Sequence, residues 1–259
     1  MPAPLPVVLP RTLQFVRHGE SAANVARMQA LVAGLPAVDL ATRDPDVPLS
    51  PRGERQAIAL GRWFAERPEA ERPTVVVASP YVRARRTAEF IVEAGGTARG
   101  EAFGADDIVL DERWREKELG LFHSLMRSGV AERHPEQDAL RALLGPFYYR
   151  PPNGESGTDV VLRVRAALAD VAREHAGERV MVVCHQVVIL SVRYVLERLT
   201  EQGLHEVWAS GDLGNCSVTS YAPDPATGRL ALRSYNVTVP VEVEGGALTL
   251  EPPHATGPA

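Results

Sequence analysis

The sequence predicts an α/β fold, built as a single three-layer α/β/α domain with a mostly parallel central sheet and an antiparallel edge strand. Short β-branched runs alternate along the chain with segments of helical spacing, which is the pattern of strands joined by crossover helices. These runs are almost continuously apolar, which is typical of parallel strands buried on both faces. The 259 residues contain no internal repeat and no linker-like stretch, so we expect one domain with a sizeable core.

The expected parallel strands are rich in valine and other apolar residues, and each is followed at once by polar side chains. They span residues 12–16, 74–78 and 179–183. Two further strands within residues 217–237 surround a turn at Thr227-Gly228. We expect them to form an antiparallel hairpin at one edge of the sheet.

Five segments combine apolar residues at helical spacing with helix-terminal signals, and we expect a helix in each. They span residues 20–30, 50–67, 81–94, 158–177 and 186–199. Ser50 and Pro51 are typical of an N-cap and a first helical position, and Gly95-Gly96 is typical of a helix end. These helices provide the crossovers that parallel strands require.

Residues that can bind anions or take part in catalysis follow the ends of the three strands. Arg17 and His18 follow the first strand, Arg83 lies just beyond the second, and His185 just beyond the third. Right-handed crossovers place the carboxyl ends of parallel strands along one edge of the sheet, where ligands of open α/β sheets bind. We therefore expect these two arginines and two histidines to converge.

Composition limits the partners and the location. The net charge of −5 provides no basic field for nucleic acid, so an anion site must be local. No apolar run is long enough to cross a bilayer, and the proline-rich N-terminus is unlike a signal peptide. Cys184 and Cys216 are too few for a disulfide framework, and the remaining histidines lack metal-ligand spacing. We expect a cytoplasmic protein with no metal site and no membrane or nucleic-acid partner, in which both thiols are buried.

Two arginines and two histidines at one edge favour binding of a phosphate dianion. Guanidinium groups donate parallel hydrogen bonds to two oxygens, and the helix N-terminus after Gly19 adds backbone donors. A neutral histidine can attack phosphorus, and the leaving oxygen then needs a proton from a carboxylic acid. The loop "LDERWREKELG", residues 110–120, offers several candidates.

Six ordered sequence blocks resemble those of one enzyme family. They are "RHGES" followed by Asn24, "LSPRGERQA", "SPYVRARRTAE", the Glu-rich loop, "NGESGTDVVLRV" and "VVCHQ". Over roughly residues 12 to 222 the chain is similar to the histidine phosphatase superfamily of phosphoglycerate-mutase-like enzymes. We expect that domain at residues 12–240, between a flexible N-terminus, 1–11, and a partly disordered C-terminal extension, 241–259.

The resemblance implies a role for each matching residue. His18 would accept the phosphoryl group, while Arg17, Arg83 and His185 would bind its oxygens. Further substrate contacts are expected from five residues: Gly19, Ser21, Asn24, Glu155 and Ser156. For the last two, capping of the following helix is an equally weighted alternative.

The proton donor has three candidates in the Glu-rich loop. The family pattern is Glu-x-x-x-Gly, and Glu116 fits it with Gly120. Glu112 competes, because "LDER" resembles the "LNER" that carries the acid in the mutases. Glu118 fits least well. We choose Glu116 as the expected donor.

Two departures from the family pattern bear on the reaction. The third strand ends Cys184-His185-Gln186 and not Ser-His-Gly, a form similar to the fructose-2,6-bisphosphatase branch. Residues 147–157 lack the arginine pair and proline run of the cofactor-dependent mutases and look more like the broad-specificity phosphatase branch.

We expect a metal-independent phosphomonoesterase that hydrolyses a small phosphorylated substrate through a phosphohistidine, without a cofactor. The alternatives are a phosphoglycerate-type phosphomutase and a catalytically inactive phosphate- or phosphoprotein-binding module. The sequence leaves a homodimer open.

Overall fold

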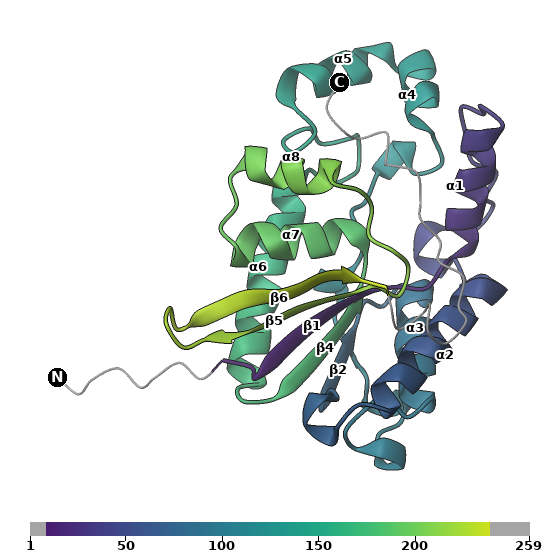
Figure 1. Ribbon diagram of the computed structural model, residues 1–259. Helices are drawn as coiled ribbons and strands as arrows, with labels where there is room; N and C mark the ends of the chain where they lie inside the picture. Colours follow the sequence, from purple (N-terminus) through teal and green to yellow (C-terminus); the bar gives the residue numbers. More distant parts are fainter. Residues whose placement is uncertain (1–8, 239–259) are drawn as a thin grey trace.

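The computed structural model describes residues 9–238. Within that range the strands form one sheet of six in the order β3-β2-β4-β1-β5-β6 (Figure 1). Their bounds are β1 (Thr12–Arg17), β2 (Val75–Ala78), β3 (Val109–Leu110), β4 (Arg179–Cys184), β5 (Val218–Asp224) and β6 (Arg229–Val237). The expected C-terminal extension, 241–259, and most of the expected flexible N-terminus, 1–11, lie outside the described residues.

The sheet is mostly parallel, with antiparallel strands along one side. β4 pairs in parallel with both β1 and β2, and β2 pairs in parallel with β3. β5 is antiparallel to β1, and β6 is antiparallel to β5. The expected α/β architecture is confirmed, and the antiparallel edge is the hairpin around Gly228, whose φ is +65°. The two-residue strand β3 was not expected, because Val109 and Leu110 are too short a run to show a pattern.

All five expected helices are present, and three more occur in the described part of the chain. The expected ones are α1 (Ala22–Val32), α2 (Pro51–Ala65), α3 (Val82–Glu93), α6 (Gly157–Glu174) and α7 (Gln186–Leu196). The additional ones are α4 (Arg127–Arg133), α5 (Pro135–Leu144) and α8 (Glu201–Ala209). In residues 9–238 no helix is long and apolar enough to cross a membrane.

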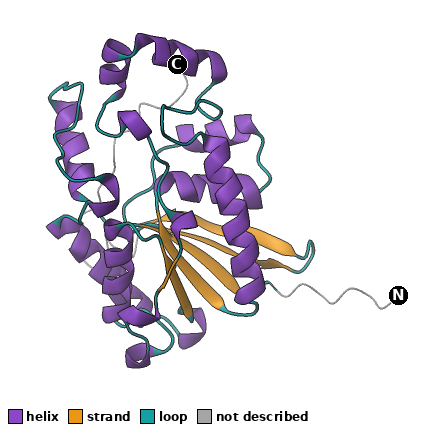
Figure 2. Ribbon diagram, turned by 180° about the vertical axis from the view of Figure 1, so that it is seen from behind, coloured by secondary structure: helices purple, strands orange, loops and turns teal. Residues whose placement is uncertain are grey.

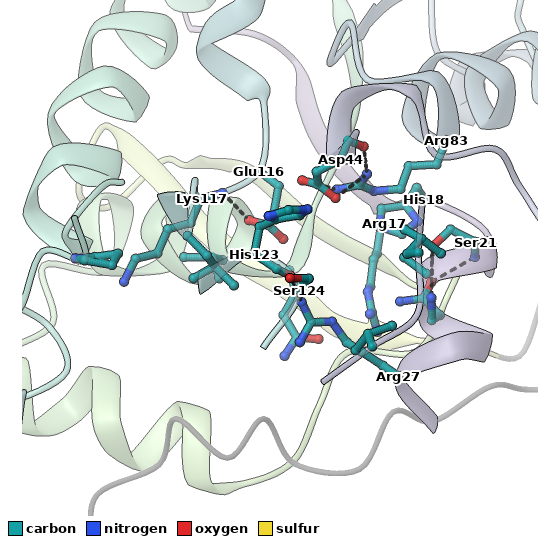
Figure 3. Close-up of a pocket in the computed structure, with 18 of the residues that line it drawn as sticks. Arg17, His18, Ser21, Arg27, Asp44, Arg83, Glu116, Lys117, His123 and Ser124 are labelled. Atoms are coloured by element: carbon teal, nitrogen blue, oxygen red, sulfur yellow. Dashed lines mark hydrogen bonds and ion pairs between the residues drawn. The ribbon is translucent and has the colours of Figure 1, made fainter. Parts of the chain in front are cut away.

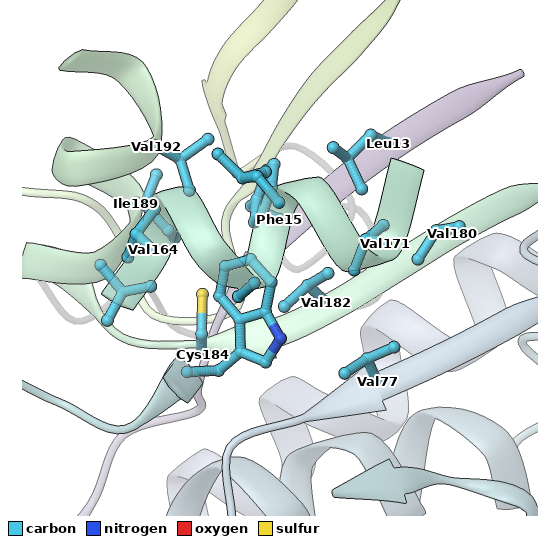
Figure 4. Packing of buried hydrophobic residues seen from close by; sticks show 14 of the residues in the cluster. Leu13, Phe15, Val77, Val164, Val171, Val180, Val182, Cys184, Ile189 and Val192 are labelled. Carbon is cyan, nitrogen blue, oxygen red and sulfur yellow. The ribbon is translucent and has the colours of Figure 1, made fainter. Parts of the chain in front are cut away.

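Alternation along the central strands builds a core on each face of the sheet, because successive side chains point to opposite sides. On β4, Val180 and Val182 pack with α6 and α7, whereas Met181 and Val183 pack with α2 and α3. Figure 2 shows helices on both sides of the sheet, and Figure 4 shows the first of these cores. This is the three-layer arrangement expected from the apolar runs.

A smaller apolar cluster holds α8 against α6 and α7. Phe147 packs with Val161 of α6, Leu190 of α7 and Leu204 of α8. Figure 1 shows α4, α5 and α8 beyond the edge at which β1 and β4 end. Two of them contribute to the far wall of the cavity described next, α5 through Arg141 and α8 through Trp208.

Candidate active site

A cavity of about 190 Å³ lies at the carboxyl edge of the parallel strands. Its lining brings together Arg17 and His18 from the end of β1, Arg83 from the first turn of α3, and Glu116 from the loop after β3. Figure 3 shows the arginines and His18 on one side of this cavity and Glu116 on the other. The predicted convergence of distant strand ends is therefore confirmed.

His18 is held in a defined neutral form. The ring is buried, with 4% of the residue exposed, and Nδ1 lies 2.7 Å from the main-chain oxygen of Gly19. Because a carbonyl only accepts hydrogen bonds, Nδ1 carries the hydrogen and Nε2 keeps its lone pair. Burial, then the charges of Arg83 and Arg17, lower the pKa of His18 well below its ordinary value of 6.5. The neutral ring is the nucleophilic form of histidine.

Arg17 is positioned by the segment that precedes β5. Its guanidinium donates to the main-chain oxygen of Leu213, and its own main-chain oxygen accepts from the Cys216 N–H at 3.0 Å. The Asn215 side-chain amide donates to the main-chain oxygen of His18 at 2.9 Å. The turn leading into the antiparallel hairpin thus holds both residues at the end of β1.

Arg83 is buried beside His18 but forms an ion pair within the cavity. Its guanidinium binds Asp44, with Nη1 3.1 Å from Oδ1. It also lies over the Tyr81 ring, 5.0 Å from the ring centroid. An acidic partner at this place was not expected from the sequence.

His185 lies beneath the cavity lining and is fully buried. Its ring centroid is 5.1 Å from that of His18, and its Nε2 lies 2.9 Å from the Ser79 hydroxyl. Nδ1 has no hydrogen-bond partner among the described residues. Burial and the charges of Arg83 and His18 lower the pKa of His185 well below 6.5. A second neutral imidazole therefore stands next to the first.

The loop that carries Glu116 is fixed by a buried ion-pair network. Glu155 accepts hydrogen bonds from Arg163 at 2.9 Å, from Arg115 at 2.8 Å and from the Glu118 N–H at 3.1 Å. Arg163 also donates to the main-chain oxygen of Glu116 at 3.2 Å. Burial is the largest single influence and opposes ionisation of Glu155, but Arg163, the Glu118 N–H and Arg115 together outweigh it and lower the pKa of Glu155.

Of the three candidate acids, Glu116 alone lines the cavity. Glu112 is the exposed first residue of the 3-10 turn Glu112–Trp114, and Glu118 is exposed and paired with Arg115 at 3.0 Å. This placement favours Glu116 as the acid.

The predicted substrate-binding residues divide into two groups. Ser21 and Asn24 line the cavity and form a capping box at the start of α1. Gly19, Glu155 and Ser156 do not line it, and each has another local partner. The Gly19 N–H donates to Thr87, and Ser156 caps α6, where the Asp159 N–H donates to its hydroxyl at 3.2 Å. The expected substrate contacts of all five residues stay predictions.

Sequence reasoning missed several polar residues of the lining. Asp44, Arg27, Lys117, His123 and Arg141 all face the cavity. Burial and the charge of Arg141 lower the pKa of Lys117 to about 8. The only signal for the last three was their place in the Glu-rich loop or in the segment that follows it. Arg27 and Asp44 had none, since neither follows a strand.

Both cysteines are buried, and burial raises the pKa of each thiol. The expected burial of both thiols is confirmed. Within residues 9–238, no group of three or more His, Cys, Asp or Glu side chains is arranged to hold a metal ion.

Comparison with known proteins places this site in a family. The chain matches the model of the histidine phosphatase superfamily (branch 1) over residues 13–238. It is 33% identical over 177 residues to a probable phosphoglycerate mutase GpmB of Enterobacter sp. (strain 638), covering 68% of this chain and 69% of that protein. It is 30% identical over 199 residues to 6-phosphofructo-2-kinase/fructose-2,6-bisphosphatase of Gallus gallus, covering 75% of this chain and 35% of that protein.

Solved structures agree with this assignment. A mycobacterial glucosyl-3-phosphoglycerate phosphatase in complex with VO3 has a TM-score of 0.64 and 25% identity, covering 88% of this chain and 99% of that one. The alpha-ribazole phosphatase of Shigella flexneri shares the fold, with a TM-score of 0.67 at 18% identity over 88% of this chain and 96% of that one. The relatives are phosphatase-type and mutase-type enzymes, and the chain belongs to branch 1 of the histidine phosphatase superfamily.

Proposed function

We propose that the chain is a phosphomonoesterase that transfers the phosphoryl group of a small substrate first to His18 and then to water, without a metal. The observation that carries this proposal is the placement of a neutral His18 ring. Its Nδ1 is hydrogen-bonded to the main-chain oxygen of Gly19, and the ring lines the same cavity as Arg17, Arg83 and Glu116. The residue types match what the two steps require.

In the first step His18 Nε2 attacks phosphorus in line with the ester oxygen. A P–N bond forms, the P–O ester bond breaks, and Glu116 gives its proton to the departing alcohol. Arg17, Arg83 and His185 donate hydrogen bonds to the phosphoryl oxygens. Buried donors that are already oriented stabilise the charge of the transition state without further reorganisation.

In the second step water attacks the phosphohistidine. Glu116, now a carboxylate, takes a proton from the water, the P–N bond breaks, and inorganic phosphate leaves with His18 neutral again. Each group returns to its starting state, so no external acid, base or cofactor is consumed.

The runner-up is a phosphomutase, and it is favoured by the name of the GpmB relative. In that reaction a second substrate hydroxyl replaces water as the acceptor of the phosphoryl group. The site residues serve both outcomes, since the nucleophile, the phosphate donors and the acid are the same. A binding module without catalysis is less well supported, because the proposed nucleophile, both arginines and the proposed acid line one cavity.

The test is phosphate release from a panel of monoesters in the presence of a chelator, with His18→Ala beside the wild type. The panel contains a phosphoglycerate, a sugar phosphate, a nucleotide, a phosphopeptide and p-nitrophenyl phosphate. We expect release that survives chelation and is absent in His18→Ala. Normal turnover by that variant would contradict the scheme, and isomerisation of a phosphoglycerate without phosphate release would favour the mutase.

A further inference from the structure

Arg83 and Asp44 form an ion pair inside the cavity that the proposed reaction uses. Nη1 of Arg83 donates to the main-chain oxygen of Asp44 at 2.7 Å and to Oδ1 at 3.1 Å, and Nη2 donates to Oδ2 at 3.3 Å. Both residues line the cavity with His18 (Figure 3). A carboxylate of the chain itself therefore occupies guanidinium donors of the kind that bind a phosphoryl group.

The two partners differ in how firmly they are held. The Arg83 side chain is 5% exposed and the Asp44 side chain 38% exposed. Arg83 stands on the first turn of α3 and lies over the Tyr81 ring. Asp44 begins a three-residue 3-10 turn, Asp44–Asp46, in the connection between α1 and α2. Arg83 is thus held in place by its surroundings. The Asp44 carboxylate is exposed enough to leave the guanidinium and be solvated instead.

We propose that Asp44 is an exchangeable counter-ion of Arg83, which a phosphoryl group displaces when it binds. The proposal rests on the proposed function, since it assumes that phosphate binds beside His18. A phosphoryl dianion and the carboxylate compete for one guanidinium and repel each other at short range. Asp44 therefore lowers the affinity of the site for phosphate and favours release of the product.

The direction in which phosphate affinity changes when Asp44 is neutralised distinguishes a counter-ion from a residue that only holds Arg83 in place. Asparagine keeps the shape of Asp44 and one side-chain oxygen acceptor, and the main-chain contact to Arg83 does not depend on the side chain. If Asp44 only braced the guanidinium, its neutralisation would leave phosphate binding unchanged or weaken it. If Asp44 is a counter-ion, neutralisation removes the competing anion and tightens phosphate binding.

Asp46 provides a matched control on the same 3-10 turn. Its carboxylate accepts a hydrogen bond from the exposed Arg43 at 2.7 Å and does not line the cavity. Asp46→Asn removes the same charge two residues away. It controls for the change in net charge and for disturbance of the turn.

The experiment is calorimetric titration of the purified full-length protein with inorganic phosphate. We expect Asp44→Asn to lower the Kd about tenfold, the size of one close charge–charge interaction in a partly exposed site. Asp44→Ser, a second neutral variant, should act in the same direction. Asp44→Glu, which keeps the charge, and Asp46→Asn should stay near the wild type. In kinetics, the inhibition constant for phosphate and the KM should fall together in Asp44→Asn.

Two results would overturn the inference. One is unchanged or weaker phosphate binding by folded Asp44→Asn and Asp44→Ser, and the other is equal tightening in Asp46→Asn. A wild type that neither binds phosphate nor releases it from any ester would overturn the proposed function as well. A wild type that does both, with neutral variants that bind no tighter, would overturn this inference alone.

Discussion

Gly19 and Gly53 pack backbone against backbone, and this contact joins the residue that follows His18 to the first turn of α2. A Cβ atom on Gly19 would lie 2.5 Å from the Gly53 main-chain oxygen, and one on Gly53 would lie 2.0 Å from the Glu20 main-chain oxygen. Both distances are far below van der Waals contact. The end of β1 and the start of α2 can approach this closely only without side chains at these two positions.

The first prediction follows from this contact. Helix propensity alone would make Gly53→Ala favourable by about 1 kcal/mol. The clash with a main-chain atom instead forces the backbone after His18 to move, as in other overpacked sites. We expect the free energy of unfolding to fall by about 1–3 kcal/mol, and kcat/KM to fall with it. Urea unfolding and steady-state kinetics measure the two effects.

Gly203→Ala is the control for that prediction, because Gly203 occupies the same helical position in α8. The N–H groups of Gly53 and Gly203 each donate to the hydroxyl of their N-cap residue at 3.1 Å. A Cβ atom on Gly203 would meet the Thr200 hydroxyl at 3.5 Å, an ordinary contact. This variant should match the wild type or gain up to about 1 kcal/mol. Equal losses in both variants would contradict the packing argument.

The second prediction concerns pH. Burial, Arg83 and Arg17 lower the pKa of folded His18 well below 6.5, whereas the unfolded chain titrates near that value. Below pH 6.5 the unfolded state therefore binds more protons than the folded state, and stability falls as the pH decreases. We expect the free energy of unfolding to decline between pH 7 and about 5, less steeply in His18→Gln than in the wild type. Urea unfolding at several pH values checks this, and equal slopes would show that another group titrates.

The strand ends were the part of the site that the sequence predicted most directly. Strands buried on both faces leave long apolar runs, and the handedness of their crossovers leaves little freedom in where they end. The meeting of Arg17, His18, Arg83 and His185 therefore followed from the order of the elements. The choice of Glu116 over Glu112 depended on one glycine spacing, and the cavity lining agrees with it.

The far wall of the cavity could not be predicted, because its position depends on contacts between residues distant in sequence. Gly129 of α4 packs against Pro36, and Ala37 forms an isolated β-bridge with Leu125. Neither contact leaves a periodic pattern. Asp44 sits on a turn of three residues, which is too short to carry a signal. Glu155, by contrast, lies in a family motif but serves an ion-pair network that only the folded chain reveals.

The last prediction distinguishes the two candidate acids, which lie in the same loop but differ in access to the cavity. Glu116→Gln keeps the shape of the side chain and removes its proton. Alkyl phosphates, whose leaving group needs that proton, should lose about 100- to 10,000-fold in kcat/KM, and p-nitrophenyl phosphate, whose leaving group departs as a stable anion, far less, because kcat/KM reports only the steps up to departure of the leaving group. Glu112→Gln should have little effect on the turnover of either ester, because Glu112 is exposed and lies outside the cavity lining. Measurement of kcat/KM for both esters in both variants is decisive, since a selective loss in Glu112→Gln alone would assign the proton transfer to Glu112.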